Sequence, residues 1–481
     1  MVTVLAYDLG ASNGRLTAQH FNGKTIKLKE VHRFTNEPFQ KEFHYYWDYE
    51  RLIKELHIGL QKAAPDKGKS IGIDTWGVDF ACLNKDSQLI QNPLSYRDKC
   101  SVPYVEKVQK IINHYDLYTR TGNEISSINT LFQLMAIDDN YNQLLDETEN
   151  ILLMPSLLMH ALSGEKINEL TIGSTTQLLN LKSENWDNEL IEKLFNKQLP
   201  LSPIGQTHEI IGKLIQFPTI QMALVPGHDT ACALSALPIE DKNGIFISLG
   251  TWGLIGMELE EAVVSLEAFQ QGFTNERTSE KMIRFQKNAT GFWILQKLRK
   301  EWQQQQVHTT FEHEEQAYYE NKEFRAIINP EDEVFFNPVS MVNAIHEFCK
   351  KTNQSIPISI AEQIRCFSES LAIYYANIID DIERITGYYS PTLYIGGGGA
   401  KNKLLCQLIA NASGKRVVAG PVEASSLGNG LSQLRALGEI SNLQEGRDVI
   451  KASFTVTEYE PQEADVWKSL KVKYKNIFRR Q

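Results

Sequence analysis

The sequence predicts an α/β protein of two domains with related architecture and a cleft between them. The chain has 481 residues, whereas a single hydrophobic core seldom grows beyond about 250–300 residues. Strand-like and helix-like apolar patterns alternate along it, which is typical of α/β folds. A strand–turn–strand pattern, YDLGASNGRL from Tyr7, recurs as ISLGTWGLIG from Ile247. This repeat favours a duplicated domain, with chance similarity as the alternative.

The composition is that of an ordinary globular protein, with 42% hydrophobic and 22% charged residues and a net charge of −10. The negative balance argues against a nucleic-acid partner or an anionic membrane surface. The six cysteines are scattered without a CxxC pair, so we expect free thiols rather than disulfides or a zinc site. The sequence shows neither a signal-peptide pattern nor a run of about 18 apolar residues, which predicts a cytoplasmic protein without a membrane partner.

The first half is predicted to open with a β-hairpin, because residues 2–9 and 15–21 are strand-like and flank a glycine turn. Asp48 resembles the N-cap of an amphipathic helix. Residues 71–80 alternate apolar and polar side chains and predict one strand, and residues 151–162 predict a core helix.

The alternation of strands and helices continues along the rest of the chain. Predicted strands cover 223–225, 244–249 and 392–395, and predicted helices cover 231–237, a long segment closed by Gly387, a segment closed by Gly414, and 466–477. The polar patch 238–243 is the best candidate boundary and divides the chain into domains 1–238 and 239–481. Residues 300–330 are polar, and we assign them no function.

The turn between the first two strands, Gly10-Ala11-Ser12-Asn13-Gly14, is a candidate phosphate-binding loop. Such a turn leaves backbone N–H groups facing outward, and glycine lets an anion approach the backbone closely. Asp8 ends the preceding strand and is placed to hold Mg²⁺ through water, because magnesium retains much of its hydration shell. Arg15 could add positive charge beside the phosphates. A plain hairpin with a surface aspartate is the alternative.

Two later loops have the same physical character. Gly250-Thr251-Trp252-Gly253 follows a predicted strand, and the Thr251 hydroxyl can donate a hydrogen bond to a terminal phosphate. Two such loops, one from each half, could hold a triphosphate from both sides. Residues 396–399 are four glycines between a strand and a helix, which permits close approach of a flat ring or a phosphate. A flexible connection is the alternative, although four successive glycines cost chain entropy.

Phosphoryl transfer to an alcohol requires a group that orients the hydroxyl and accepts its proton, and an aspartate can do both. Asp229 is the strongest candidate, since it follows a strand and a glycine and opens a helix of small residues. A simple N-cap is the alternative for Asp229, because aspartate is a common cap. Asp74 and Asp79, near Gly77 at the end of another strand, are rival candidates.

Taken in order, these segments resemble the FGGY family of carbohydrate kinases, within the sugar kinase–Hsp70–actin superfamily. The similarity runs through most of the chain, in the motifs DLGASNGR, SIGIDTWGVDF, YRD, STTQLLN, GHDTA, LGTWG, IGGGGAKN and GPVEASSLGN. GIDTWGVDF and GPVEAS are typical of the branch that phosphorylates L-rhamnulose. The resemblance implies two ribonuclease H-like (actin-like ATPase) domains with an interdomain cleft. Domain 1–238 is then expected to bind sugar and phosphate, and domain 239–481 the nucleotide, with its last helix packing back on the first domain.

The resemblance also implies a reaction, the ATP- and Mg²⁺-dependent phosphorylation of L-rhamnulose at O1 to L-rhamnulose 1-phosphate in L-rhamnose degradation. By match to the family motifs, Asp229 is implied as the proton acceptor and Asp8 as the residue that organises the metal. The implied ATP-binding residues are Ala11, Ser12, Asn13, Gly14, Arg15, Thr251, Gln296 and Gly398. The implied sugar-binding residues are Gly77, His228, Asp229, Thr230 and Asn288. Ser156 stands where related kinases tend to carry an aspartate.

Two alternatives to this activity follow from the same residues. One is the same chemistry on another ketose or polyol, such as fuculose or xylulose. The other is a non-catalytic actin-like or Hsp70-like nucleotide switch, which the GHDTA segment disfavours because a switch needs no base directed at a sugar. The expected partners are a small ketose and ATP, and the protein is expected to be a monomer or a small homo-oligomer.

Overall fold

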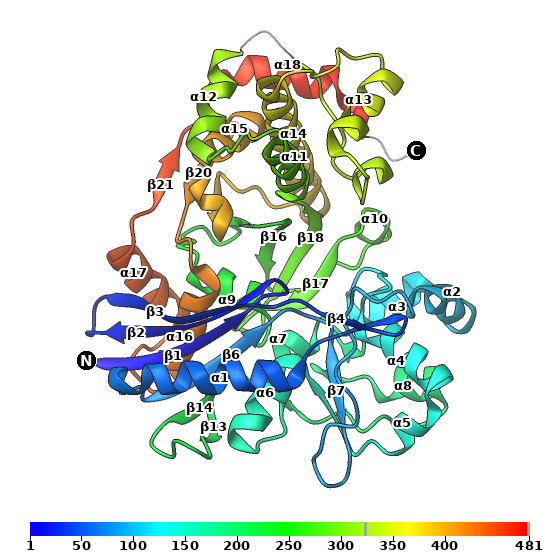
Figure 1. Cartoon of the computed structure of the whole chain (residues 1–481), viewed down its shortest axis with the longest axis vertical. Coiled ribbons are helices and arrows are strands. Elements are labelled where there is room, and N and C mark those ends of the chain that lie inside the picture. Colours follow the sequence, from blue (N-terminus) through cyan, green and yellow to red (C-terminus); the bar gives the residue numbers. More distant parts are fainter. Residues whose placement is uncertain (322–324, 479–481) are drawn as a thin grey trace. The chain divides into compact units, whose positions relative to one another are not determined.

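Two large β-sheets organise the chain in the computed structural model (Figure 1). The chain divides into two units; the first sheet belongs to the first unit, and most strands of the second sheet belong to the second unit, although β17 (Thr274–Arg277) and the start of β18 (Ile283–Thr290) are assigned to the first. The first unit comprises Met1–Pro238, Leu259–Phe285 and Ala424–Ser453, and the second comprises Ile239–Glu258, Gln286–Glu423 and Phe454–Gln481. The structure describes residues 1–321 and 325–478. Residues 322–324 of the polar stretch 300–330, and residues 479–481 of the predicted second domain, therefore lie outside the described residues.

The first unit is built on a six-stranded sheet with the strand order β13-β14-β6-β1-β2-β3. β1 (Val2–Leu9) pairs antiparallel with β2 (Asn13–Phe21) and parallel with β6 (Ser70–Thr75). β1 and β6 are buried almost throughout, as is typical of central strands covered on both faces. The largely apolar sequence of β1 predicts this burial, whereas the alternating sequence of β6 does not. The other strands are β3 (Ile26–Thr35), β13 (Glu209–Lys213) and β14 (Gln221–Leu224).

The second sheet has the order β17-β18-β16-β15-β19-β20-β21 and follows the same plan. β15 (Ile245–Leu249) pairs antiparallel with β16 (Trp252–Leu259) and parallel with β19 (Thr392–Gly396). The remaining strands are β17 (Thr274–Arg277), β18 (Ile283–Thr290), β20 (Arg416–Ala419) and β21 (Thr457–Tyr459). The predicted α/β fold with two sheet-cored domains is thus confirmed, and the shared order of strands accounts for the sequence repeat. The cleft between the domains stays a prediction.

Helices cover both faces of the first sheet. α1 (Tyr49–Ala63) and α6 (Met154–Ser163) share a hydrophobic core with one face (Figure 1), and Asp48 caps α1 by accepting a hydrogen bond from Arg51 N at 3.0 Å. α16 (Ala424–Ala436) packs on the opposite face together with α9 (Asp229–Ala236). Because side chains alternate along a strand, β1 directs Tyr7 toward α1 and Asp8 toward α16.

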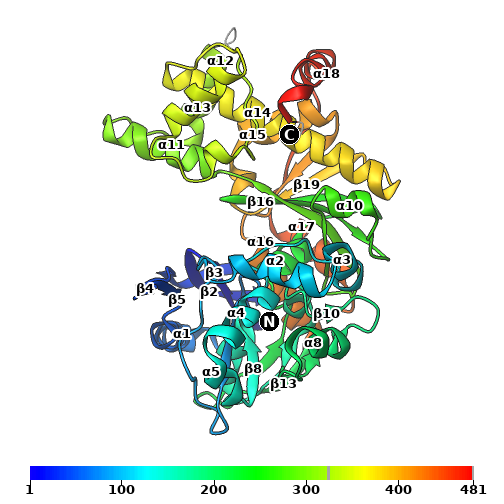
Figure 2. The ribbon, with the colours of Figure 1, turned by 90° about the vertical axis from the view of Figure 1, so that its right-hand side faces the viewer.

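In the second unit, the long helix α14 (Ile360–Thr386) lies beside α15 (Lys403–Ser413), as Figure 2 shows. Gly387 and Gly414 end these helices in the left-handed conformation, as the sequence predicts. The other helices of this unit are α11 (Trp293–Gln304), α12 (Phe311–Glu320), α13 (Met341–Lys351) and α18 (Ala464–Lys473), which contacts α15.

The remaining elements belong to the first unit. The helices are α2 (Val102–Ile111), α3 (His114–Thr121), α4 (Thr130–Asn140), α5 (Asn142–Asp146), α7 (Leu170–Gly173), α8 (Asn188–Phe195), α10 (Leu266–Gln270) and α17 (Leu443–Ser453). The short strands are β4 (Phe39–Lys41), β5 (His44–Tyr46), β7 (Phe80–Leu83), β8 (Asn150–Leu153), β9 (Asn168–Glu169), β10 (Leu179–Asn180), β11 (Asn185–Trp186) and β12 (Ile204–Gly205). No helix within the described ranges is long and apolar enough to cross a membrane.

The segment 71–80 is not one strand, contrary to its alternating pattern. β6 ends at Thr75, and β7 pairs with β8 in a separate sheet. Between them Val78 takes a left-handed conformation with φ of +67°. The turn buries the carboxylate of Asp79, which accepts hydrogen bonds from the indole N–H groups of Trp47 at 2.6 Å and Trp76 at 2.9 Å. Trp47 comes from a distant segment of the chain, so local alternation cannot reveal this part of the turn.

The segment 151–162 also differs from its prediction, because its first residues form β8. The helix α6 begins at Met154, with Pro155 in its first turn. Proline is favoured there, since the first helical N–H groups have no partner within the helix.

Helices α9 and α16 approach one another closely at Gly428. A Cβ on Gly428 would lie 1.8 Å from the backbone oxygen of Cys232 in α9. Backbone atoms cannot move away independently of their helix, so any side chain at this position must separate the two helices.

We therefore expect Gly428→Ala to lower the free energy of unfolding by about 2 to 3 kcal/mol, the usual cost of overpacking a core. Gly446→Ala is a matched control, since its Cβ would meet only the ends of flexible side chains, at 3.3 Å or more. Alanine also favours the helical conformation of α17, so Gly446→Ala should change stability by less than about 1 kcal/mol. Urea unfolding of both variants measures the difference, and equal stabilities would contradict the close approach.

Candidate active site

Two carboxylates end neighbouring parallel strands of the first sheet. Asp8 of β1 lies directly beside Asp74 of β6 in the strand register, and both point toward α16. Asp8 Oδ2 accepts a hydrogen bond from Ser426 Oγ at 3.1 Å, and Asp74 Oδ2 accepts one from Asn429 Nδ2 at 2.7 Å. Asp8 also forms an ion pair with Arg15 Nη2 at 2.6 Å. Ligands of α/β proteins bind at the carboxyl ends of parallel strands, so this edge is the natural place for a site.

Asp229, at the start of α9, interacts electrostatically with these two residues. Burial raises the pKa of the Asp74 carboxyl well above its ordinary value, and the negative charges of Asp8 and Asp229 raise it further. Burial also raises the pKa of Asp229; neighbouring His228 opposes this shift, while Asp8 adds to it. Asp74 Oδ1 is buried without a hydrogen-bond donor among residues 1–321 and 325–478.

A divalent cation would relieve this concentration of negative charge. Carboxylate oxygens are ligands that Mg²⁺ prefers, and here they converge at one end of the sheet with one oxygen unpaired. The donor set therefore fits the Mg²⁺ that we expect at Asp8, whose charge is at present balanced by Arg15.

The hairpin between β1 and β2 turns its carbonyl groups inward. Gly10 O and Ser12 O accept hydrogen bonds from Asn36, at 2.8 and 2.9 Å, and Ala11 O accepts one from Arg97 Nη2 at 3.1 Å. The amide N–H groups of Ala11 and Ser12 have no hydrogen-bond partner in the described part of the chain. The predicted phosphate loop thus presents backbone donors to an anion, as its glycine turn suggests.

The hairpin between β15 and β16 in the second unit has a similar arrangement. Gly250 O accepts a hydrogen bond from Phe292 N at 2.9 Å, and Thr251 O accepts one from Gly291 N at 3.1 Å. Within the described ranges the Thr251 amide has no partner. The Thr251 hydroxyl accepts a hydrogen bond from the exposed side chain of Gln296 at 3.1 Å, so two of the predicted ATP-binding residues lie together.

The predicted glycine loop after β19 belongs to the same unit. Gly398 is exposed, and a Cβ placed on it would find no atom within 4 Å. Its neighbour Gly399 is packed against Leu249, where a Cβ would lie 2.3 Å from a side-chain carbon. The loop therefore leaves open space at Gly398 and close packing at Gly399, which agrees with an approach of a ring or a phosphate.

The predicted sugar-binding residues of the first unit lie together. His228 Nε2 is 3.4 Å from Asp229 Oδ1, and Thr230 Oγ1 donates a hydrogen bond to the same oxygen at 3.1 Å. A Cβ on Gly77 would lie 3.3 Å from His228 Nε2, so glycine keeps space open beside the imidazole. Asn288 is exposed on β18 in the part of that strand assigned to the second unit.

The structure bears on the alternatives for Asp229. His228 is the N-cap residue of α9 and Asp229 is the first residue of the helix, so Asp229 is not a simple N-cap. The side chain of Asp229 is 29% exposed, whereas Asp74 and Asp79 are 0% and 1% exposed. Asp79 also accepts hydrogen bonds from four donors, although burial still raises its pKa to about 6. Asp229 is thus the most accessible of the three.

Sequence reasoning missed several residues that hold this site. Asn36 and Arg97 fix the first hairpin, and Glu276 and Arg284 lie behind His228. Arg97 carries a signal as part of the YRD motif, and Glu276 and Arg284 stand out only as charged residues within strand-like segments. Ser156 is buried in α6, and its hydroxyl finds no hydrogen-bond partner in the residues that the structure covers.

Family models identify both halves of the chain. Residues 3–228 match the N-terminal domain of the FGGY family of carbohydrate kinases, and residues 245–437 match its C-terminal domain. A rhamnulokinase of Bacteroides thetaiotaomicron is 35% identical, with 98% of this chain and 99% of that protein covered. A rhamnulokinase of Oceanobacillus iheyensis is 36% identical, with 95% and 97% covered.

Solved structures show the same fold at low sequence identity. Xylulose kinase from Lactobacillus acidophilus superposes with a TM-score of 0.79 at 15% identity, covering 99% of this chain and 98% of that one. Glycerol kinase from Plasmodium falciparum gives 0.80 at 15% identity, covering 99% and 97%. The family models and the fold together define a phosphotransferase built from two like, sheet-cored domains. The chain belongs to the FGGY family of carbohydrate kinases, whose members use ATP.

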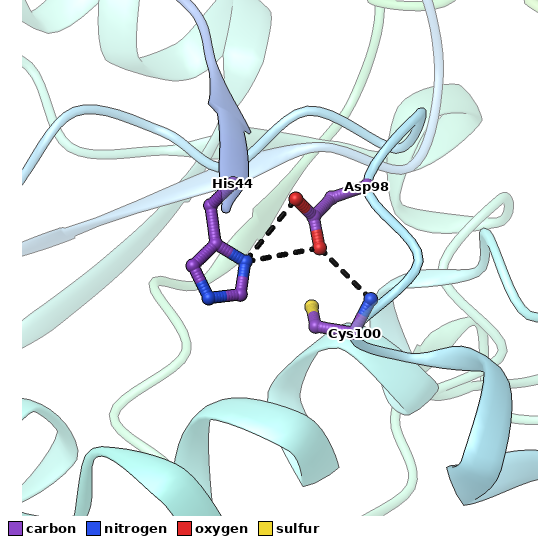
Figure 3. Close-up of side chains that lie close together, drawn as sticks. All are labelled: His44, Asp98 and Cys100. Carbon is purple, nitrogen blue, oxygen red and sulfur yellow. Dashed lines mark hydrogen bonds and ion pairs between the residues drawn. The ribbon is translucent and has the colours of Figure 1, made fainter. Parts of the chain in front are cut away.

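A separate cluster anchors the YRD segment that carries Arg97. His44 Nδ1 lies 3.1 Å from Asp98 Oδ1, and Asp98 accepts a hydrogen bond from the backbone N–H of Cys100 at 2.8 Å (Figure 3). Asp98 also accepts a hydrogen bond from the backbone N–H of Tyr45 at 2.9 Å. The three potential metal-ligand atoms of His44, Asp98 and Cys100 lie within 4.8 Å of one another. However, burial and the Asp98 charge raise the pKa of the Cys100 thiol to about 12, which disfavours the thiolate that a metal requires. We interpret the cluster as an anchor.

We expect Asp98→Ala to remove three part-buried hydrogen bonds to a charged group and to cost about 1 to 3 kcal/mol of stability. Hydrogen–deuterium exchange in a peptide spanning residues 94–100 should become faster, because the segment loses its anchor. Cys100→Ala is the control, since it retains the carboxylate and should leave exchange unchanged. Unaltered exchange in Asp98→Ala would contradict the anchor, and a melting temperature raised by Zn²⁺ in the wild type but not in Cys100→Ala would identify a metal centre instead.

Proposed function

We propose that this FGGY kinase transfers the γ-phosphoryl group of ATP to the 1-hydroxyl of L-rhamnulose, giving L-rhamnulose 1-phosphate for L-rhamnose degradation. The observation that carries the proposal is the similarity to proteins named rhamnulokinase, at 34–36% identity over nearly the whole chain. The reaction consumes ATP, so we infer a cytoplasmic location. Whether the enzyme is a monomer or a small homo-oligomer stays a prediction.

In this proposal the O1 oxygen forms a bond to the γ-phosphorus while the bond between that phosphorus and the ADP oxygen breaks. The proton of the 1-hydroxyl passes to Asp229, whose carboxylate is accessible and lies beside His228. Gly77, His228, Thr230 and Asn288 contact the sugar. The open space at Gly77 supports this assignment, since a Cβ on this residue would lie 3.3 Å from His228 Nε2 and fill space that the sugar needs.

The proposed ATP-binding set comprises backbone and side-chain donors within each of the two units. The unpaired amide N–H groups of Ala11 and Ser12 support phosphate binding by the first hairpin, and Thr251 with Gln296 supports it in the second unit. Asn13, Gly14, Arg15 and Gly398 complete the proposed ATP-binding set. Donors fixed before the reaction stabilise the charge that develops on the transferred group without further reorganisation. Asp8 would hold Mg²⁺, which supplies positive charge to the phosphate oxygens.

The substrate is tested by a panel of L-rhamnulose, L-fuculose, D-xylulose and glycerol in a coupled assay of ADP release. We expect L-rhamnulose to give the highest kcat/KM and, with ATP, the largest rise in melting temperature. A higher kcat/KM with another sugar would assign the enzyme to that sugar. ATP turnover that no sugar accelerates would favour a nucleotide switch.

We expect Asp229→Asn to bind both substrates and to lose turnover by about 10²- to 10⁴-fold, the usual contribution of a general base. Asp48→Asn is the control, because asparagine caps a helix as well as aspartate does. The wild-type kcat/KM should rise with pH, since only the ionised carboxylate accepts a proton. Burial raises the pKa of Asp229. As the pH falls, activity should therefore be lost at a higher pH than the ordinary pKa of an aspartate would predict. Near-wild-type turnover in Asp229→Asn would refute the assignment.

A further inference from the structure

A buried cluster of three side chains lies behind the candidate base in the first unit. Glu276 of β17 and Arg284 of β18 face the side of His228 opposite Asp229. The side chain of Arg284 is 0% exposed, and that of Glu276 is 10% exposed. Arg284 Nη2 donates hydrogen bonds to both Glu276 Oε2 and His228 Nδ1. Nothing in the proposed reaction requires these two residues, so their arrangement calls for an explanation.

We propose that Arg284 is a positioning residue that fixes His228 as the tautomer with its proton on Nε2. A guanidinium group donates hydrogen bonds and cannot accept them. His228 Nδ1, which faces Arg284 Nη2, must therefore offer a lone pair. In a neutral imidazole the proton then resides on Nε2, the nitrogen that lies 3.4 Å from Asp229 Oδ1.

Glu276 would favour the opposite tautomer if Arg284 were absent. Its Oε2 lies 3.5 Å from His228 Nδ1, and a carboxylate accepts hydrogen bonds. Burial opposes ionisation of Glu276, but the positive charge of Arg284 holds the pKa of this carboxyl below its ordinary value. Glu276 therefore balances the charge of Arg284, while the closer Arg284 determines which nitrogen of His228 is protonated.

The geometry of Arg284 differs from that of a purely structural ion pair. Arg299 and Glu314 form such a pair with two parallel hydrogen bonds, at 2.7 and 2.8 Å. Arg284 instead uses Nη2 for both of its partners, and its Nε and Nη1 are buried with no hydrogen-bond partner anywhere in the described chain. The Arg284 guanidinium thus does not form a bidentate ion pair with Glu276, and the same nitrogen also binds His228.

The consequence for catalysis rests on the proposed function. An Nε2–H group can donate a hydrogen bond to Asp229 or to a sugar oxygen in the space beside Gly77. A side chain at Gly77 would reduce this space, because its Cβ would lie 3.3 Å from His228 Nε2. An unprotonated Nε2 would instead place a lone pair against the Asp229 carboxylate. Arg284 therefore prepares both the base and the sugar-binding face.

Nuclear magnetic resonance of the protein labelled with ¹⁵N-histidine tests the tautomer directly, with His228→Gln used to assign the signals. We expect the wild type to show an unprotonated Nδ1 and a protonated Nε2. In Arg284→Met, ionised Glu276 becomes the nearest partner of Nδ1, and we expect the proton to move to Nδ1. The value of kcat should fall about tenfold or more, as for the loss of a hydrogen bond to a charged group, while KM for ATP stays unchanged.

The double variant Glu276→Gln with Arg284→Met removes both buried charges and keeps the test available if Arg284→Met does not fold. In this double variant we expect His228 to be no longer fixed as the tautomer with its proton on Nε2. A wild-type proton on Nδ1, or an unchanged Nε2–H tautomer in either folded variant, would overturn the proposal.

The chain offers a matched control in a second trio of the same residue types. Arg435 Nη1 donates hydrogen bonds to Glu280 and to His208 Nε2, the latter at 2.9 Å. Arg435→Met should alter the signals of His208 and leave those of His228 unchanged, with kcat within about twofold of wild type, because separate sites act independently. The resonance measurement uses neither sugar nor ATP. If the sugar panel contradicts the proposed substrate, the tautomer proposal still stands. If the tautomer is wrong, the proposed substrate still stands.

Discussion

Burial of carboxylates on one face of the first sheet is the constraint that shapes this part of the molecule. An unpaired charge taken out of water costs several kcal/mol, so the helix on that face must carry polar groups and lie close to the strands. α16 meets both demands, since Ser426 and Asn429 donate hydrogen bonds to Asp8 and Asp74, and Gly428 permits close contact with α9. Its small, polar sequence is therefore explained by the carboxylates it covers rather than by helix propensity.

The two glycine hairpins reach one arrangement by different means. In the first unit, the side chains of Asn36 and Arg97 and the Asn36 amide bind the loop carbonyls. In the second, backbone N–H groups of residues 291–293 do so. In each hairpin the loop carbonyl groups accept hydrogen bonds from the protein, and at least one loop amide N–H has no partner in the described residues and can bind an anion. Because different partners can produce the same result, the sequence repeat is short although the order of strands agrees over the whole sheet.

Local features of the fold could be predicted from the sequence, whereas long-range features could not. The hairpins, the cap at Asp48 and the glycine helix ends depend on neighbouring residues, and the structure contains them. From the residues alone, Asp229 could be either the base or a helix cap, and its exposure in the structure separates it from the buried Asp74. The motif GPVEASSLGN was visible, but its place beside Asp8 was not, because Ser426 and Asp8 are 418 positions apart. Arg284 was invisible for the same reason, since its role depends on contacts with β17 and α9.

The first unit is discontinuous in sequence, and this has a consequence for its biosynthesis. Its last segment, Ala424–Ser453, includes the helix that covers the buried acids. Chains are made from the N-terminus at about 5–20 residues per second, so this helix is made only after residues 286–423 of the second unit. Until then the sheet of the first unit lacks the helix that covers its buried acids. Folding of the first unit can therefore be completed only after most of the second unit has been synthesised.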